Sequence, residues 1–291
     1  MTQTVFSLTQ QDHRSLGIRR DPLTGEYISV AGTVPLLDSY SRRLQANGTL
    51  LEAEAAAFAG ADHQDDAADP LSALEAGALR PQEPTHLETI STFGQLSDSL
   101  VTALLGEYIA RFTELVPRRD ISELSVKEMC VEGEVTAQIA GFTAPSEATE
   151  TVDEQAQRWA RRTGGDLLAD VLVSEIVASE RILFTGDHWV AYVPYASAHP
   201  CEIMLLPKAP SRNLVAMTDS AQEDLQRTYR RALAALRRLS GVAASYTSTW
   251  HMAPIPHCRA VSRMRVHITA ETDLLRGKTP EQVAQTLREH L

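Results

Sequence analysis

Three histidines near the C-terminal end of the chain are of the residue type that binds divalent metals: His251, His257 and His267. Neutral imidazole suits zinc and iron, and carboxylates complement it in mixed donor sets. Upstream carboxylates are available at Glu147, Glu150 and Glu154. These residue types permit a zinc or iron site. The alternative is that the histidines are core or loop residues bonded to backbone groups.

Two basic residues and a histidine in a turn are suited to an anionic ligand. Lys208 follows an apolar, strand-like run, and Arg265 belongs to a locally basic region with Arg259 and Arg263. His199 lies in a turn, and its imidazole titrates close enough to neutral pH for acid–base catalysis. Each has a simpler reading. Lys208 is then an exposed residue after a strand, the arginines contact the chain's own acidic segment, and His199 is solvated.

The elements that must position these residues are short β-rich runs and amphipathic helices. Strands are expected at residues 135–142, 189–193, 203–206 and 245–250, and a turn leads into another strand at 27–30. Apolar periodicity predicts helices over residues 100–116, 151–179 with a break at Gly164-Gly165, and 220–239. Ser220 and Glu223 suggest a capping box, and Thr279-Pro280 suggests the start of a terminal helix. This pattern predicts an α+β fold with antiparallel strands and helices packed on them.

Composition narrows the class of protein. The chain has 291 residues and a formal net charge of −11, which argues against nonspecific nucleic-acid binding. Much of the acidity lies in residues 51–85, an Ala-, Glu- and Asp-rich stretch expected to be a linker. No apolar run approaches the roughly 18 residues of a membrane span, and the N-terminal residues lack the pattern of a signal peptide. The three cysteines form no CxxC pair. We therefore expect a cytoplasmic protein that does not bind a membrane.

Several segments resemble the galactose-1-phosphate uridylyltransferase family, a branch of the histidine-triad superfamily, in their order and spacing. They are the run from Arg20 to Tyr27, the run from His188 to Lys208, the run from Leu214 to Asp219, and Trp250-His251-x-Ala253-Pro254. The resemblance implies two histidine-triad-like modules, each an antiparallel half-barrel sheet with packed helices, at residues 1–150 and 151–291. It also implies a homodimer and a nucleotide- or phosphate-type small-molecule ligand.

The chain departs from this family where the family does its chemistry. The His-Pro-His-Gly-Gln nucleophile motif aligns with residues 134–139, where Thr136 falls near the nucleophile position and Gln138 is retained. The family's zinc ligands and its sugar-phosphate segment have no counterpart. His251 and His267 match two histidines of the family's second metal site, while Arg265 stands where the first histidine of its HxH motif would be. The resemblance thus favours a metal set of His251, His257, His267 and Glu154. It leaves Gln138 and His199 as candidate catalytic residues and Lys208 and Arg265 as candidate ligand-binding residues.

Three functional hypotheses remain open at this point. The first is a repurposed family member that applies different chemistry to a nucleotide- or phosphate-type small molecule in a specialised pathway. The second is a non-catalytic pseudoenzyme that acts by binding. The third is an active nucleotidylyltransferase on a sugar phosphate whose nucleophile lies elsewhere in the chain.

Overall fold

The structure is a computed structural model that describes residues 18–29, 83–92, 97–240, 245–255, 263–270 and 272–291. Residues 18–29 and 84–291, within those bounds, belong to one compact unit. The acidic stretch 51–85, apart from its last residues, and the candidate ligand His257 lie outside the described residues.

One antiparallel sheet organises the described unit, in the strand order β3-β5-β4-β9-β10-β8-β7-β6. Its strands are β3 (His86–Thr92), β5 (Glu134–Phe142), β4 (Glu123–Val131), β9 (Tyr246–His251), β10 (Arg265–Ala270), β8 (Cys201–Pro207), β7 (Trp189–Tyr192) and β6 (Ile182–Thr185). A separate hairpin joins β1 (Ile18–Arg20) to β2 (Tyr27–Ser29). The predicted α+β class with antiparallel strands is confirmed. Strands from before and after residue 150 belong to the same sheet. The division into two modules at this residue therefore stays a prediction.

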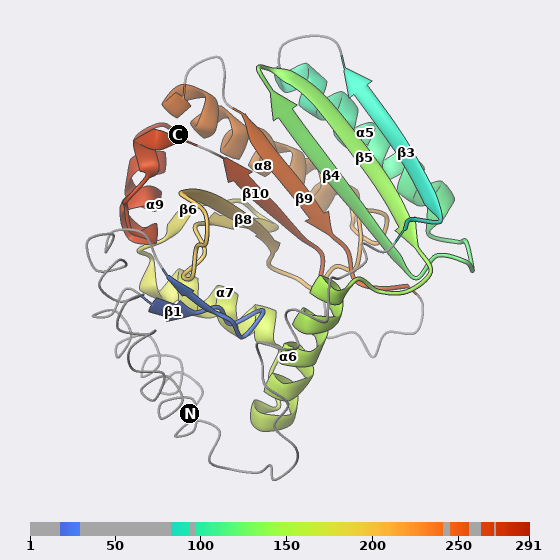
Figure 1. Cartoon of the computed structure of the whole chain (residues 1–291), viewed down its shortest axis with the longest axis horizontal. Helices are drawn as coiled ribbons and strands as arrows, with labels where there is room; N and C mark the ends of the chain where they lie inside the picture. Colours follow the sequence, from blue (N-terminus) through green and yellow to red (C-terminus); the bar gives the residue numbers. More distant parts are fainter. Residues whose placement is uncertain (1–17, 30–82, 93–96, 241–244, 256–262, 271) are drawn as a thin grey trace, which may run out of the picture. The chain divides into compact units, whose positions relative to one another are not determined.

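Helices lie on both sides of this sheet (Figure 1). One side carries α5 (Asp98–Leu115), α8 (Asp219–Ser240) and α9 (Pro280–Arg288), and the other carries α6 (Glu147–Thr163) and α7 (Leu167–Ala178). A short 3-10 turn, η1, spans Asp273–Leu275. The predicted break between α6 and α7 is confirmed, because Gly164 ends α6 in the left-handed conformation. None of the described helices is both long and apolar enough to cross a bilayer.

Of the two predicted helix caps, the one at α9 is confirmed and the one at α8 is wrong. Thr279 caps α9 with the full capping box that the sequence suggests, since its hydroxyl accepts from the backbone N–H of Gln282 and the Gln282 side chain accepts from the backbone of Thr279. At α8 the predicted cap was wrong. The helix begins earlier, and the hydroxyl of Thr218, not that of Ser220, accepts from the N–H of Ala221 at 3.3 Å.

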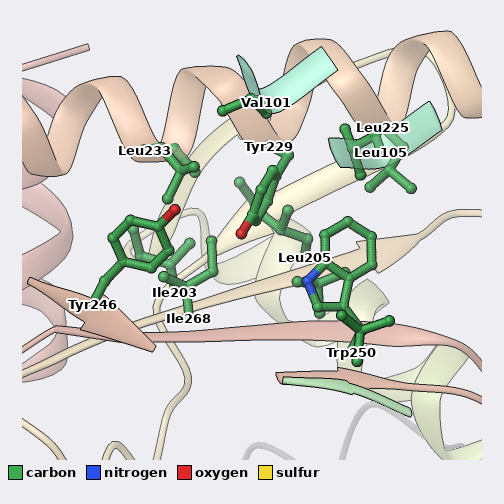
Figure 2. Close-up of a cluster of buried hydrophobic side chains, with 14 of the residues drawn as sticks. Val101, Leu105, Ile203, Leu205, Leu225, Tyr229, Leu233, Tyr246, Trp250 and Ile268 are labelled. Atoms are coloured by element: carbon green, nitrogen blue, oxygen red, sulfur yellow. The ribbon is translucent and has the colours of Figure 1, made fainter. Parts of the chain in front are cut away.

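The main core fills the space between the sheet and helices α5 and α8. Figure 2 shows Tyr229 and Leu233 of α8 directed towards Trp250, Tyr246 and the aliphatic side chains of β8 and β10. Trp250 meets Tyr108 and Tyr229 edge-on, with ring centroids 5.6 and 5.0 Å apart. Strand alternation sends every second residue of β9 and β10 into this core, so the residues between them face the opposite side of the sheet.

That opposite side is covered over part of its width. A second apolar cluster joins the hairpin turn, α6 and α7 to β7 and β8: Leu23, Val152, Ala156, Trp159, Leu167, Leu168, Val171, Leu172, Val190, Tyr192, Met204 and Leu206. Over β4, β5 and β9 the same side carries exposed or half-exposed side chains, among them Lys127, Gln138 and Thr249. We call this part of the sheet, over which none of the described helices packs, the open face.

The turn between β6 and β7 supplies a test of the packing. Asp224 of α8 accepts the backbone N–H groups of His188 and Trp189 at 2.7 and 3.0 Å. A Cβ at Gly186 would lie 2.6 Å from an oxygen of that carboxylate. Gly186→Ala should therefore lower the free energy of unfolding by about 1–3 kcal/mol, the usual cost of overpacking, as measured by urea denaturation.

Gly106 is the matched control for this substitution. It lies within α5, and a Cβ there would meet nothing within 4 Å. Gly106→Ala should raise the free energy of unfolding by up to about 1 kcal/mol, because alanine favours the helix interior. Equal effects at the two glycines would contradict the close contact between Gly186 and Asp224.

Candidate functional site

Four polar side chains form a line across the open face. Lys127 of β4 pairs in register with Gln138 of β5 on one side and with Thr249 of β9 on the other. Thr249 in turn pairs with His267 of β10. We call these four residues the polar row. Directly opposed residues have Cβ atoms about 5 Å apart, and four adjacent strands give the row a length of roughly 14 Å.

Lys127 supplies the positive charge of the polar row. Its side chain is exposed, and it makes no hydrogen bond or ion pair with any residue that the structure describes. Gln138 and Thr249 flank it with an amide and a hydroxyl, groups that donate hydrogen bonds to phosphate oxygens. An exposed ammonium between two neutral donors is suited to a phosphate group.

His267 ends the row beside a buried carboxylate. Its Nε2 lies 3.7 Å from Oε2 of Glu202, whose side chain is 5% exposed. The other oxygen of Glu202 accepts the backbone N–H groups of Ala198 and His199, both at 3.1 Å. Burial raises the pKa of Glu202, but the electrostatic interactions with His267, His199 and Ser197 outweigh it, so the pKa falls below its ordinary value. The carboxylate of Glu202 faces the Nε2 edge of the imidazole and so orients the ring.

A second line of residues runs beside the polar row. His251 of β9 pairs in register with Ser125 of β4 and with Arg265 of β10. Arg265 is 7% exposed and makes no hydrogen bond or ion pair with the described residues. Burial lowers the pKa of His251 well below its ordinary value, and the charges of Arg265 and His267 lower it further. His251 is therefore a neutral imidazole at neutral pH.

The structure brings four of the predicted site residues to one face of the sheet: Gln138, His251, Arg265 and His267. Glu154 is separate from them. It is exposed on α6 and pairs with Arg158 at 3.0 Å. His199 is exposed in the loop between β7 and β8, where its backbone N–H bonds to Glu202.

Lys208 does not reach the polar row. It lies just beyond the end of β8, and its Nζ donates to the carbonyl oxygen of Gly186 in the β6–β7 turn at 2.6 Å. The ligand-binding role predicted for Lys208 therefore stays a prediction that needs its own test.

The predicted zinc or iron site lacks a fitting donor set among the described residues. No three His, Cys, Asp or Glu side chains in this part of the chain lie close enough together to hold a metal ion. The guanidinium-bearing residue Arg265 stands directly opposite His251 and two positions before His267 on the same face of the sheet. A cation is a poor neighbour for another cation. His257 lies outside the described residues, so the metal stays a prediction.

Sequence reasoning missed Lys127, Thr249 and Glu202. The alternation of side chains in β4 gave only a broken signal for Lys127, since the core side of the strand includes the charged residue Glu128 and the outward side includes the apolar residue Met129. Thr249 and Glu202 carried no signal of their own. They gain significance only from the register that places them beside His267 or within reach of it.

Comparison with known proteins identifies relatives of this fold. Residues 151–284 match the family profile described as galactose-1-phosphate uridyl transferase, C-terminal domain. A galactose-1-phosphate uridylyltransferase from Streptomyces lividans is 32% identical over 116 residues, which are 39% of this chain and 32% of that protein. The chain thus aligns with about a third of the length of this relative.

Two solved structures share the fold over nearly their whole length. A uridylyltransferase gives a TM-score of 0.62 at 15% identity, covering 94% of this chain and 98% of that one. An ADP-glucose phosphorylase from Arabidopsis thaliana with bound ADP-glucose gives 0.61 at 14% identity, covering 94% and 97%. At these identities the likeness shows the fold alone.

Proposed function

Because this chain belongs to the galactose-1-phosphate uridylyltransferase family through residues 151–284, we propose that its polar row binds a phosphate-bearing small molecule of the nucleotide-sugar class. The observation that carries this proposal is Lys127, an exposed ammonium without a partner among the described residues, placed in register between Gln138 and Thr249. A relative of the same fold holds ADP-glucose, which supports this ligand class.

The row suits a phosphate-bearing ligand in length and in chemistry. Hydrogen bonds from a charged donor to phosphate are stronger than neutral ones, so Lys127 contributes most of the affinity. Gln138 and Thr249 add neutral donors on either side of it. At the end of the row, His267 with Glu202 is placed to take a proton from a hydroxyl or water near the bound phosphate.

The chemistry we propose differs from a histidine-nucleophile route on β5. Thr136 lies two residues before Gln138 on the same side of β5, at the position that aligns with the family's nucleophile. A threonine hydroxyl is a weak nucleophile unless a base lies beside it. The acid–base pair His267 and Glu202 therefore carries the proposed reaction, in a repurposed member of the family. The cytoplasmic location and the homodimer belong to the same proposal.

Calorimetric titration tests the binding site. The full-length protein should bind UDP-glucose or ADP-glucose. Lys127→Met should raise the dissociation constant by about 10- to 100-fold, since a charged hydrogen bond contributes about 1.5–3 kcal/mol. Arg276→Met, which removes an exposed cation after η1, is the charge-matched control and should leave the constant unchanged. Lys208→Met should leave the dissociation constant unchanged if the ligand binds at the polar row, and should raise it if the ligand binds at the site expected from the sequence. Equal affinities in the wild-type and Lys127→Met proteins would refute the polar row.

A turnover assay separates the repurposed enzyme from the two alternatives. Cleavage of the bound nucleotide sugar that is lost in His267→Gln, with a dissociation constant that changes far less than in Lys127→Met, would support acid–base chemistry. A ligand that binds without turnover would support the pseudoenzyme. A covalent, acid-labile nucleotidyl adduct on a histidine would instead identify an active nucleotidylyltransferase, with its nucleophile outside β5.

A further inference from the structure

The eight-stranded sheet ends at β3 on one side and at β6 on the other (Figure 1). We propose that the β3 edge pairs with β3 of a second copy of this chain, so that one sheet runs through both copies. This inference rests on the homodimer proposed above and names the surface through which the two copies meet. It does not depend on the ligand, because β3 contributes no residue to the polar row.

The β6 edge is protected against such pairing. β6 has only four residues, and its register with β7 shifts between Ile182 and Phe184. The guanidinium of Arg288 on α9 donates hydrogen bonds to the carbonyl oxygens of Glu180 and Ile182, at 3.1 and 2.8 Å. Short length, an irregular register and a covering side chain are devices by which proteins keep a sheet edge from recruiting another strand.

The β3 edge has none of these devices. The seven residues of β3 pair with β5 in an unbroken antiparallel register. The strand contains neither lysine nor proline, the residues that commonly blunt an edge. Its one carboxylate, Glu88, is paired within the same copy, since Nε of Arg111 on α5 lies 3.0 Å from it. A long, regular edge of this kind is a template for a further strand.

The β4–β5 hairpin shows which way the backbone groups of β5 point. Its two-residue turn, Glu132-Gly133, has φ angles of 52° and 88°, as in a type I′ turn. The residues that close such a turn, here Val131 and Glu134, exchange backbone hydrogen bonds. In β5 the N–H and C=O groups of every second residue from Glu134 are therefore directed at β4, and those of the residues between them at β3.

Three residues of β3 consequently present their backbone groups at the edge. Leu87, Thr89 and Ser91 stand opposite residues of β5 whose backbone groups are directed at β4, so their own N–H and C=O groups point outward. None of these groups bonds to a backbone group of any residue that the structure describes. All three side chains are exposed, and that of Leu87 is 55% exposed. An antiparallel partner strand forms two hydrogen bonds with each of the three residues.

β3 is complementary to itself when two copies run antiparallel about Thr89. This register overlaps the whole strand, places Thr89 opposite the same residue of the second copy, and places Leu87 opposite Ser91. Threonine pairs across strands are favourable, and no like charges are directly opposed. A register centred on Glu88 would place two carboxylates opposite each other, which is unfavourable. The second copy is therefore the partner that fits this edge.

Pairing at this edge brings the two polar rows onto one face. Thr89 stands in register with Gln138, the residue at the β5 end of the polar row. A two-fold axis perpendicular to the sheet keeps the open faces of both copies on the same side. The strand order then separates the two Lys127 residues by five strand spacings, a distance of roughly 24 Å. The dimer thus presents two phosphate sites on one continuous sheet.

Cysteine cross-linking tests the register. In Thr89→Cys the new thiols lie on directly opposed residues, whose Cα atoms are about 5.5 Å apart, a separation that a disulfide bridges. Thr89→Cys should form a covalent dimer under mild oxidation, above the background that the native cysteines give in the wild-type protein. Ser91→Cys is the matched control on the same edge and should form none, since the two copies of residue 91 lie roughly 14 Å apart. An equal yield in Ser91→Cys, or no covalent dimer in Thr89→Cys, would overturn this register.

Sedimentation equilibrium without ligand tests the surface itself. Thr89→Pro removes an outward N–H group and leaves the pairing of β3 with β5 intact. It should raise the dimer dissociation constant at least about 10-fold, because a symmetric interface loses the same hydrogen bond twice. Thr89→Lys should act in the same direction and covers the case in which proline disturbs folding. Thr185→Lys, at an exposed threonine of β6, is the matched control and should leave the constant unchanged.

The possible results separate this surface from the rest of the proposed function. A dimer that persists unchanged in Thr89→Pro and Thr89→Lys would refute the β3 surface and leave the homodimer standing. A wild-type protein that stays monomeric at all concentrations would refute both. Nucleotide-sugar binding at Lys127 is measured by calorimetry, so neither result decides the ligand.

Discussion

Replacing Arg181 with methionine is expected to lower the free energy of unfolding by about 3–5 kcal/mol, the cost of breaking a buried ion pair by removing one partner. The Arg181 side chain is fully buried, with Nε 2.9 Å from Glu175 and Nη1 2.7 Å from Glu281. Burial raises the pKa of Glu175, and the charge of Arg181 opposes that rise. Without Arg181, the carboxylate of Glu175 is left in the core with no direct cation.

The loss should extend to the N-terminal hairpin. Arg19 of β1 forms two hydrogen bonds to the same Glu281, at 2.9 and 3.0 Å. The ring of Tyr195 lies 4.4 Å from the guanidinium of Arg19 and 5.0 Å from that of Arg181. Arg181 thus helps to hold the element that carries Asp21. Hydrogen exchange should report faster opening of β1 and β2 in Arg181→Met.

Two variants check the physical reason for this large effect. Arg158→Met removes an exposed partner of Glu154 and should cost less than about 0.5 kcal/mol, as exposed helical pairs do. The double change Arg181→Met with Glu175→Leu should recover much of the lost stability, since an apolar pair can replace a buried ion pair at little cost. A loss below about 1 kcal/mol in Arg181→Met, measured by urea denaturation, would contradict the buried-pair account.

The sequence was a good guide wherever local pattern decides the structure. Apolar periodicity predicted α5 and α8 closely, and the double glycine predicted the break between α6 and α7. Residues 189–193 and 203–206 were predicted as strands because both faces of β7 and β8 are buried, which produces continuous apolar runs. In these segments a residue's neighbours in sequence are also the neighbours that determine its conformation.

The sequence was a poor guide wherever long-range register decides the function. β4 was not predicted, because Glu128 occupies a core position and breaks the apolar alternation of the strand. Lys127 therefore had no predicted strand to place it next to Thr249. The pairing of Arg19 with Glu281 spans most of the chain. Such contacts depend on strand order, which a single sequence does not reveal.

Glu128 is the second residue at which a large effect is expected. Its two carboxylate oxygens accept hydrogen bonds from three buried tyrosines: Tyr108 at 2.6 Å, Tyr229 at 2.8 Å and Tyr246 at 2.6 Å. Glu128→Leu would remove the acceptor shared by the three phenolic hydroxyls, and Figure 2 shows two of these tyrosines, Tyr229 and Tyr246, in the core. At about 1–3 kcal/mol for each group that loses its acceptor, the free energy of unfolding should fall by roughly 3–9 kcal/mol.

Removing the tyrosine hydroxyls together with the carboxylate is the decisive control. The combined variant Glu128→Leu, Tyr108→Phe, Tyr229→Phe and Tyr246→Phe keeps the shape of the core but leaves no unpaired polar group. It should regain most of the stability lost in Glu128→Leu, because replacing both partners of a hydrogen bond with apolar groups is close to neutral. If the combined variant is no more stable than Glu128→Leu, the loss comes from a cavity and not from unpaired hydroxyls.

The pH dependence of stability gives an independent check on Glu128. Burial raises its pKa, and the three tyrosine hydrogen bonds only partly oppose the rise. The folded protein therefore binds this proton more tightly than the unfolded chain, so Glu128 makes stability fall as pH rises above the ordinary carboxyl range. Glu128→Gln removes that titration. The difference in unfolding free energy, wild type minus Glu128→Gln, should therefore decrease from acidic to neutral pH. A difference that does not change with pH would show that Glu128 has the same pKa in the folded and unfolded states.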